Sequence, residues 1–482
     1  MNLYEITLQL EIQLLSLQWL FLTYLAAVNG GYLLLNLLSM FSISHYMRGR
    51  VLDPVPGAGG FEPPVSLLVP AYNEAATIVA SIRSLLQLNY PEFEIVVVND
   101  GSSDDTMAEL VREFGLVDYP TANWAQLECQ PIRGFYRSTK FRRLRVIDKE
   151  NGGKADALNA AINASRYPLF CAMDADSILD RNALFKVAQP FIDEPKTIAA
   201  GGTIRIANGC SVSGGYLQKV RLPRSLLARM QIIEYLRAFL FGRLGWSPMN
   251  AMLIISGAFG LFKKSAVVEA GGYRTDTVGE DMELVVRLHR LYRQQRRPYR
   301  ISYVPDPICW TEAPESLTVL KRQRTRWQRG LAESLSANAS LLLHPRSGLV
   351  GWLAFPFFLL FELLGPLVEV LGYLSLILGF AFGLISTEAF VTFMFLGLSF
   401  GVLLSTSALL LEEMSFRLYP RGRQLFWLVT AAIIENFGYR QLVSWWRFQG
   451  LLRWVFRAEQ RWGEMTRLAS WRKDSRKSGS AG

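Results

Sequence analysis

The chain has 482 residues, of which 50% are hydrophobic and only 19% are charged. Soluble proteins average about 25% charged residues, and here the deficit is uneven, since long stretches almost without charge alternate with stretches typical of a soluble enzyme. This pattern excludes an intrinsically disordered chain, a collagen-like chain and a simple soluble single-domain protein. The net charge of +10 suits either nucleic acid or an anionic membrane surface.

The cysteines and histidines exclude the common zinc sites. The four cysteines are far apart and form no CxxC pair, so neither a zinc ribbon nor a disulfide framework is indicated. The three histidines form no HExxH motif. Any metal that the protein uses is therefore expected to be a hard ion bound by carboxylates.

Residues 1–50 predict an N-terminal transmembrane segment. Within a stretch that lacks Asp, Glu, Lys and Arg, Trp19–Met40 is long enough to cross a hydrocarbon core, which takes about 20 residues. A signal peptide is the alternative, but the residues before the segment carry Glu5 and Glu11 rather than positive charge. Two arginines follow the segment, so the positive-inside rule places residue 50 onward in the cytoplasm.

A linker rich in Pro and Gly covers residues 51–64, and residues 65–345 have the pattern of a folded α/β domain. Four short apolar runs predict buried strands at Val65–Pro70, Glu94–Val98, Leu144–Lys149 and Tyr167–Met173. Ala75–Leu88 and a segment from about Lys154 have helical periodicity. Alternating strands and helices predict a parallel sheet, with functional residues at the carboxyl ends of its strands.

Residues 346–446 are apolar again and predict transmembrane or interfacial helices. Residues 348–411 contain three charges, all glutamates, which leaves room for two or three spans with a break at Gly365-Pro366. A further segment at residues 424–446 carries Glu435. If the domain and the chain end both lie in the cytoplasm, the number of crossings between them is even, and two and four both stay open.

Residues 447–482 predict a basic cytoplasmic tail. Residues 440–482 contain ten Lys and Arg against three Asp and Glu, a net charge of +7. This excess lies next to the predicted membrane segments, and the chain has no recognisable nucleic-acid-binding module. Membrane lipid, and not nucleic acid, is therefore the expected partner of the positive charge.

Polar residues follow the predicted strands. Asp100, in NDGSSDD, can accept hydrogen bonds from a nucleobase or ribose, although Asp-Gly-Ser-Ser is also ordinary turn chemistry. In NGGKAD two glycines precede Lys154, which opens a helix with Asp156 on its first turn. Backbone N–H groups and a lysine at a helix N-terminus suit a phosphate, while a capped surface helix is the plainer interpretation. The segment is not a Walker A motif.

Two acidic motifs come next. Asp174 and Asp176 directly follow an apolar strand and can hold Mg²⁺ or Mn²⁺ against a diphosphate, or can simply form a cap and turn. Glu280 and Asp281 precede a segment with helical periodicity. Acidic residues at a helix start are often caps, but one that reaches a hydroxyl can act as its general base.

The last motif is QRTRW at residues 323–327. A basic helix near a membrane is ordinarily an interfacial face. The alternative gives Arg326 a diphosphate to bind and Trp327 a sugar face on which to stack.

In this order the motifs resemble those of the processive, membrane-embedded family 2 glycosyltransferases, which include cellulose, hyaluronan, chitin and poly-N-acetylglucosamine synthases. The resemblance covers residues 65–345 and, in layout, the flanking membrane segments. SGAFGLF at residues 256–262 resembles the acceptor-side segment of the amino-sugar polymer synthases, and RWGEMTR at 461–467 resembles a tail near the active site of some members.

The resemblance implies an α/β fold with a GT-A-type (Rossmann-like) glycosyltransferase domain and flanking transmembrane and interfacial helices. Tyr72, Glu74 and Asp100 would hold uridine, and Lys154 and Asp156 would lie by the diphosphate. The motif departs from the family in one respect, because an asparagine stands before Asp100 where the family has a second acid. The remaining carboxylate should suffice.

The other motifs receive roles in the same way. Asp174 and Asp176 match the DxD pair, with Asp176 as the direct ligand of Mg²⁺ or Mn²⁺. Asp281, next to Glu280, matches the catalytic base. The residues that match QxxRW, at the acceptor terminus and the diphosphate, are Gln323, Arg326 and Trp327.

The implied function is inverting, metal-dependent transfer of a sugar from a UDP-sugar donor to a growing glycan acceptor, processive and coupled to export. SGAF favours N-acetylglucosamine over glucose. Transfer of one sugar to a lipid or short acceptor is the nearest alternative, and an inactive scaffold of an export complex is the alternative from another class. The implied location is the inner or plasma membrane, multi-pass, with the catalytic domain cytoplasmic and a small membrane subunit as a candidate partner.

Overall fold

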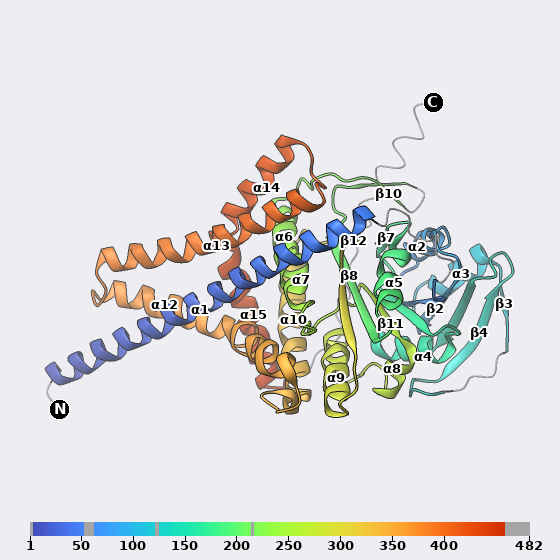
Figure 1. Cartoon of the computed structure of the whole chain (residues 1–482), viewed down its shortest axis with the longest axis horizontal. Helices are drawn as coiled ribbons and strands as arrows, with labels where there is room; N and C mark the ends of the chain where they lie inside the picture. The colour runs from blue at the N-terminus through green and yellow to red at the C-terminus, as the bar shows by residue number, and fades with distance from the viewer. Residues whose placement is uncertain (1–2, 53–61, 121–124, 214–215, 458–482) are drawn as a thin grey trace.

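The computed structural model describes residues 3–52, 62–120, 125–213 and 216–457. A body of strands and helices occupies one side of the molecule, and long helices project from its other side (Figure 1). The RWGEMTR segment and most of the predicted basic tail lie outside the described residues, as does most of the predicted linker.

A ten-stranded mixed sheet forms the centre of the body, in the order β3-β4-β5-β2-β1-β6-β11-β8-β12-β7. Its strands are β1 (Val65–Ala71), β2 (Phe93–Asp100), β3 (Leu116–Asp118), β4 (Ile132–Ser138), β5 (Leu144–Lys149), β6 (Leu169–Met173), β7 (Ile178–Leu179), β8 (Thr197–Ile206), β11 (Phe259–Lys263) and β12 (Arg300–Thr311). The strands β5, β2, β1 and β6 run parallel. Because β1, β2 and β6 are buried almost throughout, they read as continuous apolar runs.

The prediction of a parallel sheet holds for most of the sheet, since β8 and β12 also pair parallel, but it is wrong for β4, β7 and β11, which run antiparallel to their neighbours. β11 pairs antiparallel with β6 and β8, and β4 pairs antiparallel with β3 and β5. A buried apolar run looks the same in either direction, so periodicity could not give the direction of a strand such as β11. The four predicted strands are confirmed. One has the predicted bounds, and the others differ by one or two residues at an end.

Helices pack against the sheet and complete the body. They are α2 (Ile78–Leu85), α3 (Thr106–Phe114), α4 (Lys154–Ala164), α5 (Ala183–Asp193), α8 (Lys264–Glu269) and α9 (Glu280–Gln294), and a short hairpin adds β9 (Ser211–Ser213) and β10 (Tyr216–Lys219). α4 begins at Lys154, as predicted, and packs on β1 and β2. α2 starts later than predicted, because the N–H groups of Thr77 and Ile78 donate to the carbonyl of Glu74 in a turn.

Among the described residues, two helices are long and apolar enough to cross a membrane. One is part of α1 (Leu3–Leu52), over Trp19–Gly49, and the other is α13 (Thr387–Ser415). α1 and α13 lie side by side and project from the body together with α12 (Gly365–Ala381) (Figure 1).

A bent pair of helices is a third candidate span. Val350–Leu363, built from η3 (Val350–Ala354), α11 (Phe355–Phe357) and η4 (Phe358–Leu363), meets α12 at 42°. The bend lies directly before the predicted break, where Pro366 has no N–H with which to continue the preceding helix. With this pair counted as one span, two candidate spans follow the domain, which is the lower of the two even numbers expected.

The predicted segment at residues 424–446 is two helices and not one. α14 (Gly422–Ile434) and α15 (Tyr439–Val455) are separated at Gly438, whose φ of 95° is a conformation that favours glycine. Neither helix is long enough to be a candidate span. Residues 447–455, predicted to start the tail, continue α15.

Four helical elements join the domain to the membrane side. They are α6 (Leu226–Tyr235), η1 (Leu236–Phe241), α7 (Gly242–Trp246) and α10 (Leu317–Ala337), which the short η2 (Ala339–Leu341) follows. α10 packs against both α9 and α15, and α7 packs against α1. A Cβ on Gly279, just before α9, would lie 2.8 Å from the Cα of Gly330 in α10, so only glycines permit this contact. The start of α9 is thereby held against the middle of α10.

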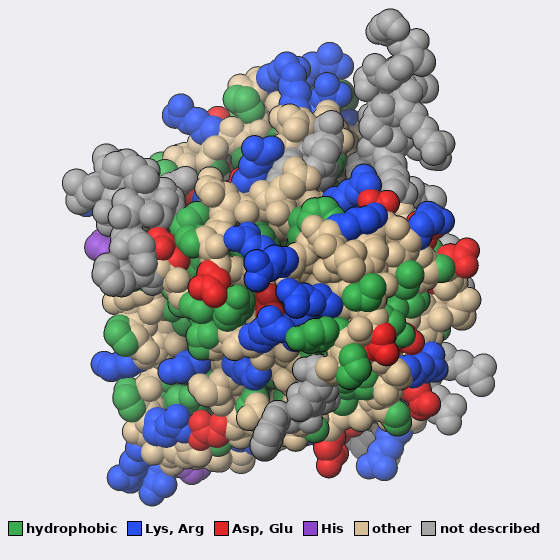
Figure 2. Space-filling view, turned by 90° about the vertical axis from the view of Figure 1, so that its right-hand side faces the viewer, with side chains coloured by type: hydrophobic (Ala, Val, Ile, Leu, Met, Phe, Trp, Pro, Cys, Tyr) green, Lys and Arg blue, Asp and Glu red, His purple; other side chains and the backbone are tan. Residues whose placement is uncertain are grey.

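The end of the domain that points away from the membrane helices has the character of a water-exposed surface. Figure 2 shows Lys and Arg side chains gathered across its middle, with acidic and apolar groups scattered among them. Large exposed apolar side chains are instead frequent on α1, α12 and α13. This division of the surface agrees with a domain beside, and not within, a membrane.

We expect α9 to make the fold sensitive to acid. His289 is fully buried, with Nδ1 2.7 Å from the Tyr299 hydroxyl and Nε2 2.9 Å from the Met252 carbonyl. Burial lowers the pKa of His289 to about 4. The unfolded chain binds this proton near pH 6.5, so the free energy of unfolding should fall by about 3 kcal/mol as the pH drops from 6.5 to 4.

Thermal unfolding of the purified full chain in detergent, at pH 7 and pH 5, measures this effect. The His289→Gln variant keeps a donor for Met252 and should lose less stability than the wild type on acidification. The variant of the exposed His45, His45→Gln, should respond to pH as the wild type does. Equal responses of His289→Gln and wild type would contradict the assignment.

Candidate active site

A cavity of about 1730 Å³ runs from the carboxyl ends of β1, β2 and β6 to the candidate membrane-spanning helices. Its lining includes Tyr72 and Glu74 after β1, and Asp100 at the end of β2. At the other end it reaches Phe21 of α1 and Phe393 of α13. The cavity therefore joins the edge of the sheet where polar residues were predicted to gather with the apolar helices that project from the domain.

Eleven of the twelve predicted site residues line this cavity. They are Tyr72, Glu74, Asp100, Lys154, Asp174, Asp176, Glu280, Asp281, Gln323, Arg326 and Trp327. Asp156 is absent from the lining and lies buried on the first turn of α4. The structure thus gathers residues that are spread over about half of the sequence.

The carboxylate of Asp100 organises the loop before α4. Its Oδ1 accepts a hydrogen bond from the N–H of Gly152 at 3.0 Å, and its Oδ2 accepts one from Gly153 at 2.8 Å. Gly153 has a φ of 87°, which explains the glycine at that position. Asp100 therefore shapes the loop that carries Lys154, besides facing the cavity.

Lys149, at the end of β5, is a buried cation that sequence reasoning missed. Its side chain is 0% exposed, and its Nζ lies 2.6 Å from Oδ1 of Asp100 and 2.6 Å from Oδ1 of Asp156. The Asp156 carboxylate also accepts from the N–H of Gln130 at 3.0 Å. A lysine that ends a predicted buried strand was the available signal, because such a charge needs partners.

A second charge cluster lies at the cavity wall. The Nζ of Lys154 is 2.6 Å from Oδ1 of Asp174, 3.2 Å from the Gly257 carbonyl and 3.6 Å from Oε1 of Glu280. Although burial favours the neutral amine, the two carboxylates raise the pKa of Lys154 above its ordinary value. Burial raises the pKa of Glu280, against the attraction of Lys154. The Lys154 ammonium therefore stays protonated and is paired with two acidic side chains.

The side chain of Asp281, in the first turn of α9, lines the cavity. Its Oδ2 accepts from the N–H of Gly257 at 2.8 Å, and its Oδ1 accepts from the N–H of Met282 at 2.8 Å. These backbone donors fix the carboxylate next to the SGAF segment. The contact between Gly279 and Gly330 places it beside the QRTRW motif of α10.

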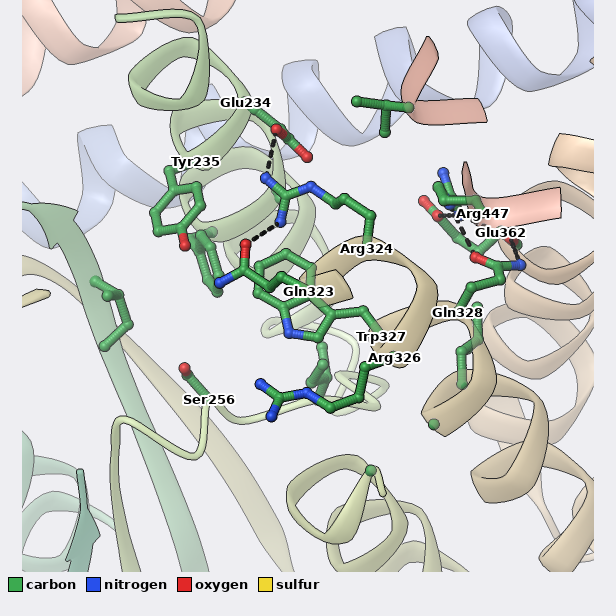
Figure 3. Close-up of a pocket in the computed structure, with 18 of the residues that line it drawn as sticks. Glu234, Tyr235, Ser256, Gln323, Arg324, Arg326, Trp327, Gln328, Glu362 and Arg447 are labelled. Carbon is green, nitrogen blue, oxygen red and sulfur yellow. Dashed lines mark hydrogen bonds and ion pairs between the residues drawn. The ribbon is translucent and has the colours of Figure 1, made fainter. Parts of the chain in front are cut away.

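Within QRTRW the side chains divide into two groups (Figure 3). Arg326 and Trp327 project toward Ser256, while Arg324 extends toward Glu234. Arg324 is 2% exposed, its Nη2 lies 2.8 Å from Oε2 of Glu234, and its Nη1 donates to Oε1 of Gln323 at 2.9 Å. Its guanidinium carbon lies 4.3 Å from the centre of the Trp327 ring. Arg324, which the sequence-based roles omitted, thereby supports the side chains that face the cavity.

The described protein residues do not by themselves supply a complete set of metal ligands. Asp174 and Asp176 supply carboxylates at the end of β6, but the described residues include no group of three or more His, Cys, Asp or Glu that could hold an ion. Mg²⁺ typically takes one or two carboxylates and completes its shell with waters and substrate phosphates. The two residues therefore fit a divalent ion that a bound diphosphate would help to hold.

We expect the buried lysine to be essential to the donor end of the cavity. In Lys149→Met the carboxylates of Asp100 and Asp156 lose their shared cation, which should lower the free energy of unfolding by about 3–5 kcal/mol. Thermal unfolding measures this effect. Lys140→Met, at an exposed lysine, should change stability by less than about 0.5 kcal/mol. A Lys149→Met protein as stable as the wild type would contradict this role.

The sequence matches known families and proteins over the same region. Residues 132–330 match a family described as glycosyltransferase like family 2, and residues 66–121 match glycosyl transferase family 2. A poly-beta-1,6-N-acetyl-D-glucosamine synthase of Staphylococcus epidermidis is 34% identical over 272 residues, which cover 56% of this chain and 55% of that protein. The protein of the same name from Staphylococcus aureus strain COL is 35% identical over 274 residues, with the same coverage. The matches thus span about half the length of these curated relatives.

A solved structure resembles the fold over most of the chain. The mannosyltransferase of Pyrobaculum calidifontis, in complex with GDP-Man and Mn²⁺, superposes with a TM-score of 0.52 at 20% identity, over 88% of this chain and 99% of that one. At this identity the likeness concerns the fold alone. It confirms the predicted α/β fold of GT-A type.

Proposed function

The chain belongs to the family 2 glycosyltransferases, and on this premise we propose that it transfers N-acetylglucosamine from its UDP derivative to a growing polysaccharide, with inversion at the anomeric carbon. The observation that carries the proposal is the single cavity that contains Lys154, Asp281 and QRTRW and then continues to the membrane helices. The choice of sugar rests on the SGAF segment and on the names of the curated relatives.

At the sheet edge, the donor would bind with uridine against Tyr72, Glu74 and Asp100. The Lys154 ammonium would then lie by the diphosphate, where the charge of the leaving group grows as the anomeric bond breaks. A Mg²⁺ or Mn²⁺ ion held by Asp174 and Asp176, with Asp176 as its direct ligand, would supply further neutralisation of that charge.

Asp281 would act as the general base. Its carboxylate would take the proton of the acceptor hydroxyl while that oxygen attacks the anomeric carbon from the face opposite the diphosphate. One displacement inverts the configuration and needs no covalent enzyme intermediate. Arg326 would bind the diphosphate and Trp327 would stack on the acceptor sugar, with Gln323 beside it, so that both reactants are held in register.

The membrane end of the cavity supports a polymeric product. Glu362 and Glu369 line it, and each has a partner, because Oε2 of Glu362 lies 2.8 Å from Nη2 of Arg447 and Oε2 of Glu369 accepts from the Ser444 hydroxyl. Ionisable groups in such a position are costly unless they serve a path or a contact. Glu435, which pairs with Arg237, does not line the cavity.

This arrangement gives the reason for a membrane location. A glycan lengthened at QRTRW could pass as it grows along the part of the cavity lined by α1, α12 and α13, with the domain on the cytoplasmic side where nucleotide-sugars are made. Processive export is therefore the form of the reaction we propose. Product sizing tests it, because addition of a single sugar would reject processivity.

The Asp281→Asn variant tests the base. An amide oxygen can still accept from Gly257, so the fold and UDP affinity should remain, while transfer should fall by about 10²- to 10⁴-fold. Release of UDP and product length, measured on purified protein, give the rate, and calorimetry gives UDP affinity. Asp276→Asn, at an exposed acid of the preceding loop, should transfer normally. Full activity of Asp281→Asn would reject the assignment.

Chelation tests the metal. With excess EDTA we expect transfer to cease, and added Mg²⁺ or Mn²⁺ should restore it, because Asp174 and Asp176 lie where a diphosphate would complete the ion's coordination. Binding of UDP with and without Mn²⁺, followed by calorimetry, gives a readout independent of turnover. Undiminished transfer in excess chelator would count against this site.

A further inference from the structure

Arg243 in α7 is a buried cation that the fold leaves without an acid partner. It is 4% exposed and lines the cavity. Its Nε and Nη1 have no hydrogen-bond partner among the described residues, and its guanidinium carbon lies 4.0 Å from the centre of the Phe239 ring. By contrast, the buried Arg205 and Arg324 form ion pairs with Glu412 and Glu234.

An unpaired buried guanidinium is expensive to maintain, since it has given up hydration without gaining hydrogen bonds. Burial lowers the pKa of Arg243 to about 10, with Asp281 acting in the opposite direction, so the group remains charged near neutral pH. Stacking on Phe239 recovers only part of this cost. A donor kept unsatisfied at a cavity wall is a typical property of a binding site.

The surroundings of Arg243 suit a sugar. Arg243 and Asp281 line the same cavity, and the Asp281 carboxylate acts to raise the pKa of Arg243. The wall beside Arg243 is aromatic, because Phe239, on which its guanidinium stacks, packs against Tyr235 with 4.7 Å between ring centres, and all three residues line the cavity. Aromatic faces with a few hydrogen-bond donors suit a sugar ring.

The arrangement of the neighbouring side chains also suits a sugar of the acceptor. Tyr235, Ser256, Arg326 and Trp327 point into one space, as Figure 3 shows. Ser256 begins the SGAF segment, and Gly257 of that segment donates to Asp281 at 2.8 Å. The space beside the proposed base is thus bounded by the acceptor-side motif, by QRTRW and by the helix that carries Arg243.

We propose that Arg243 is an acceptor-binding residue, whose guanidinium donates hydrogen bonds to an oxygen of the acceptor's terminal sugar and so holds the attacking hydroxyl within reach of Asp281. This inference rests on the proposed function. It assigns the acceptor end of the cavity a charged donor that none of the sequence motifs contains. Hydrogen bonds to a charged group typically change affinity by about 10- to 100-fold.

Arg243→Met and Arg243→Lys in the full chain test the proposal. For Arg243→Met we expect an acceptor KM raised about 10- to 100-fold with N-acetylglucosamine oligosaccharides, and an unchanged Kd for UDP. Arg243→Lys, which keeps a donor, should recover part of the loss. Calorimetric titration of the oligosaccharide into UDP-saturated protein gives the acceptor affinity without turnover.

The unfolding temperature of Arg243→Met distinguishes a binding role of Arg243 from a structural role. Because Arg243 has no ion pair to lose, Arg243→Met should keep or raise the wild-type unfolding temperature. The matched control is Arg205→Met, at an equally buried arginine 2.5 Å from Glu412 and outside the cavity lining. It should lower the unfolding temperature and leave the acceptor KM of the folded protein unchanged.

Three results would overturn the proposal. They are normal acceptor KM and affinity in Arg243→Met, loss of UDP affinity in that variant, and destabilisation equal to that of Arg205→Met. The proposed function fails separately, if wild-type protein releases no UDP from UDP-N-acetylglucosamine in the presence of acceptor. In that case the titration with oligosaccharide still decides whether Arg243 binds a sugar.

Discussion

The end of the cavity at the sheet edge depends on one buried cation shared by two carboxylates. Lys149 lies between Asp100 at the end of β2 and Asp156 on the first turn of α4, with 2.6 Å from its Nζ to an oxygen of each. In a low-dielectric interior such a cluster is stable only with all members present. It ties two parallel strands to the helix that begins at Lys154, and Asp100 also accepts hydrogen bonds from Gly152 and Gly153 in the loop before that helix.

The end of the cavity beside Asp281 and QRTRW is built differently, from close backbone contacts between helices. Gly279 and Gly330 let α9 and α10 touch, and Gly450 allows α15 to approach the Thr325 carbonyl, where a Cβ would lie 2.6 Å away. These contacts connect the start of α9, the QRTRW helix and the membrane side. The Asp281 carboxylate and the part of the cavity that reaches the long apolar helices are therefore both positioned against the same helix, α10.

Much of the fold and of the site was predictable from local patterns. Continuous apolar runs identified β1, β2, β5 and β6, and NGGK identified the start of α4 at its residue, because burial and glycine conformations leave strong local signals. β11 was not predicted as a strand, and its direction could not have been predicted either, since an apolar run reads the same in both directions. Lys149, Arg243 and Arg324 were missed for a related reason, as a charged residue in a sequence does not reveal whether it is buried or what it faces.

By itself the sequence determined which groups are present and on which kind of element. It placed carboxylates after apolar strands, a lysine at a helix start, and QRTRW beside apolar helices. Only the tertiary structure decided which of these groups share a space. Eleven of the predicted residues line one cavity. Asp156 does not line it and instead pairs with Lys149, while Arg243 lines it with Nε and Nη1 lacking a hydrogen-bond partner among the described residues. The physical reason is that hydrogen bonding and charge pairing depend on distances between segments far apart in the chain, which local periodicity does not encode.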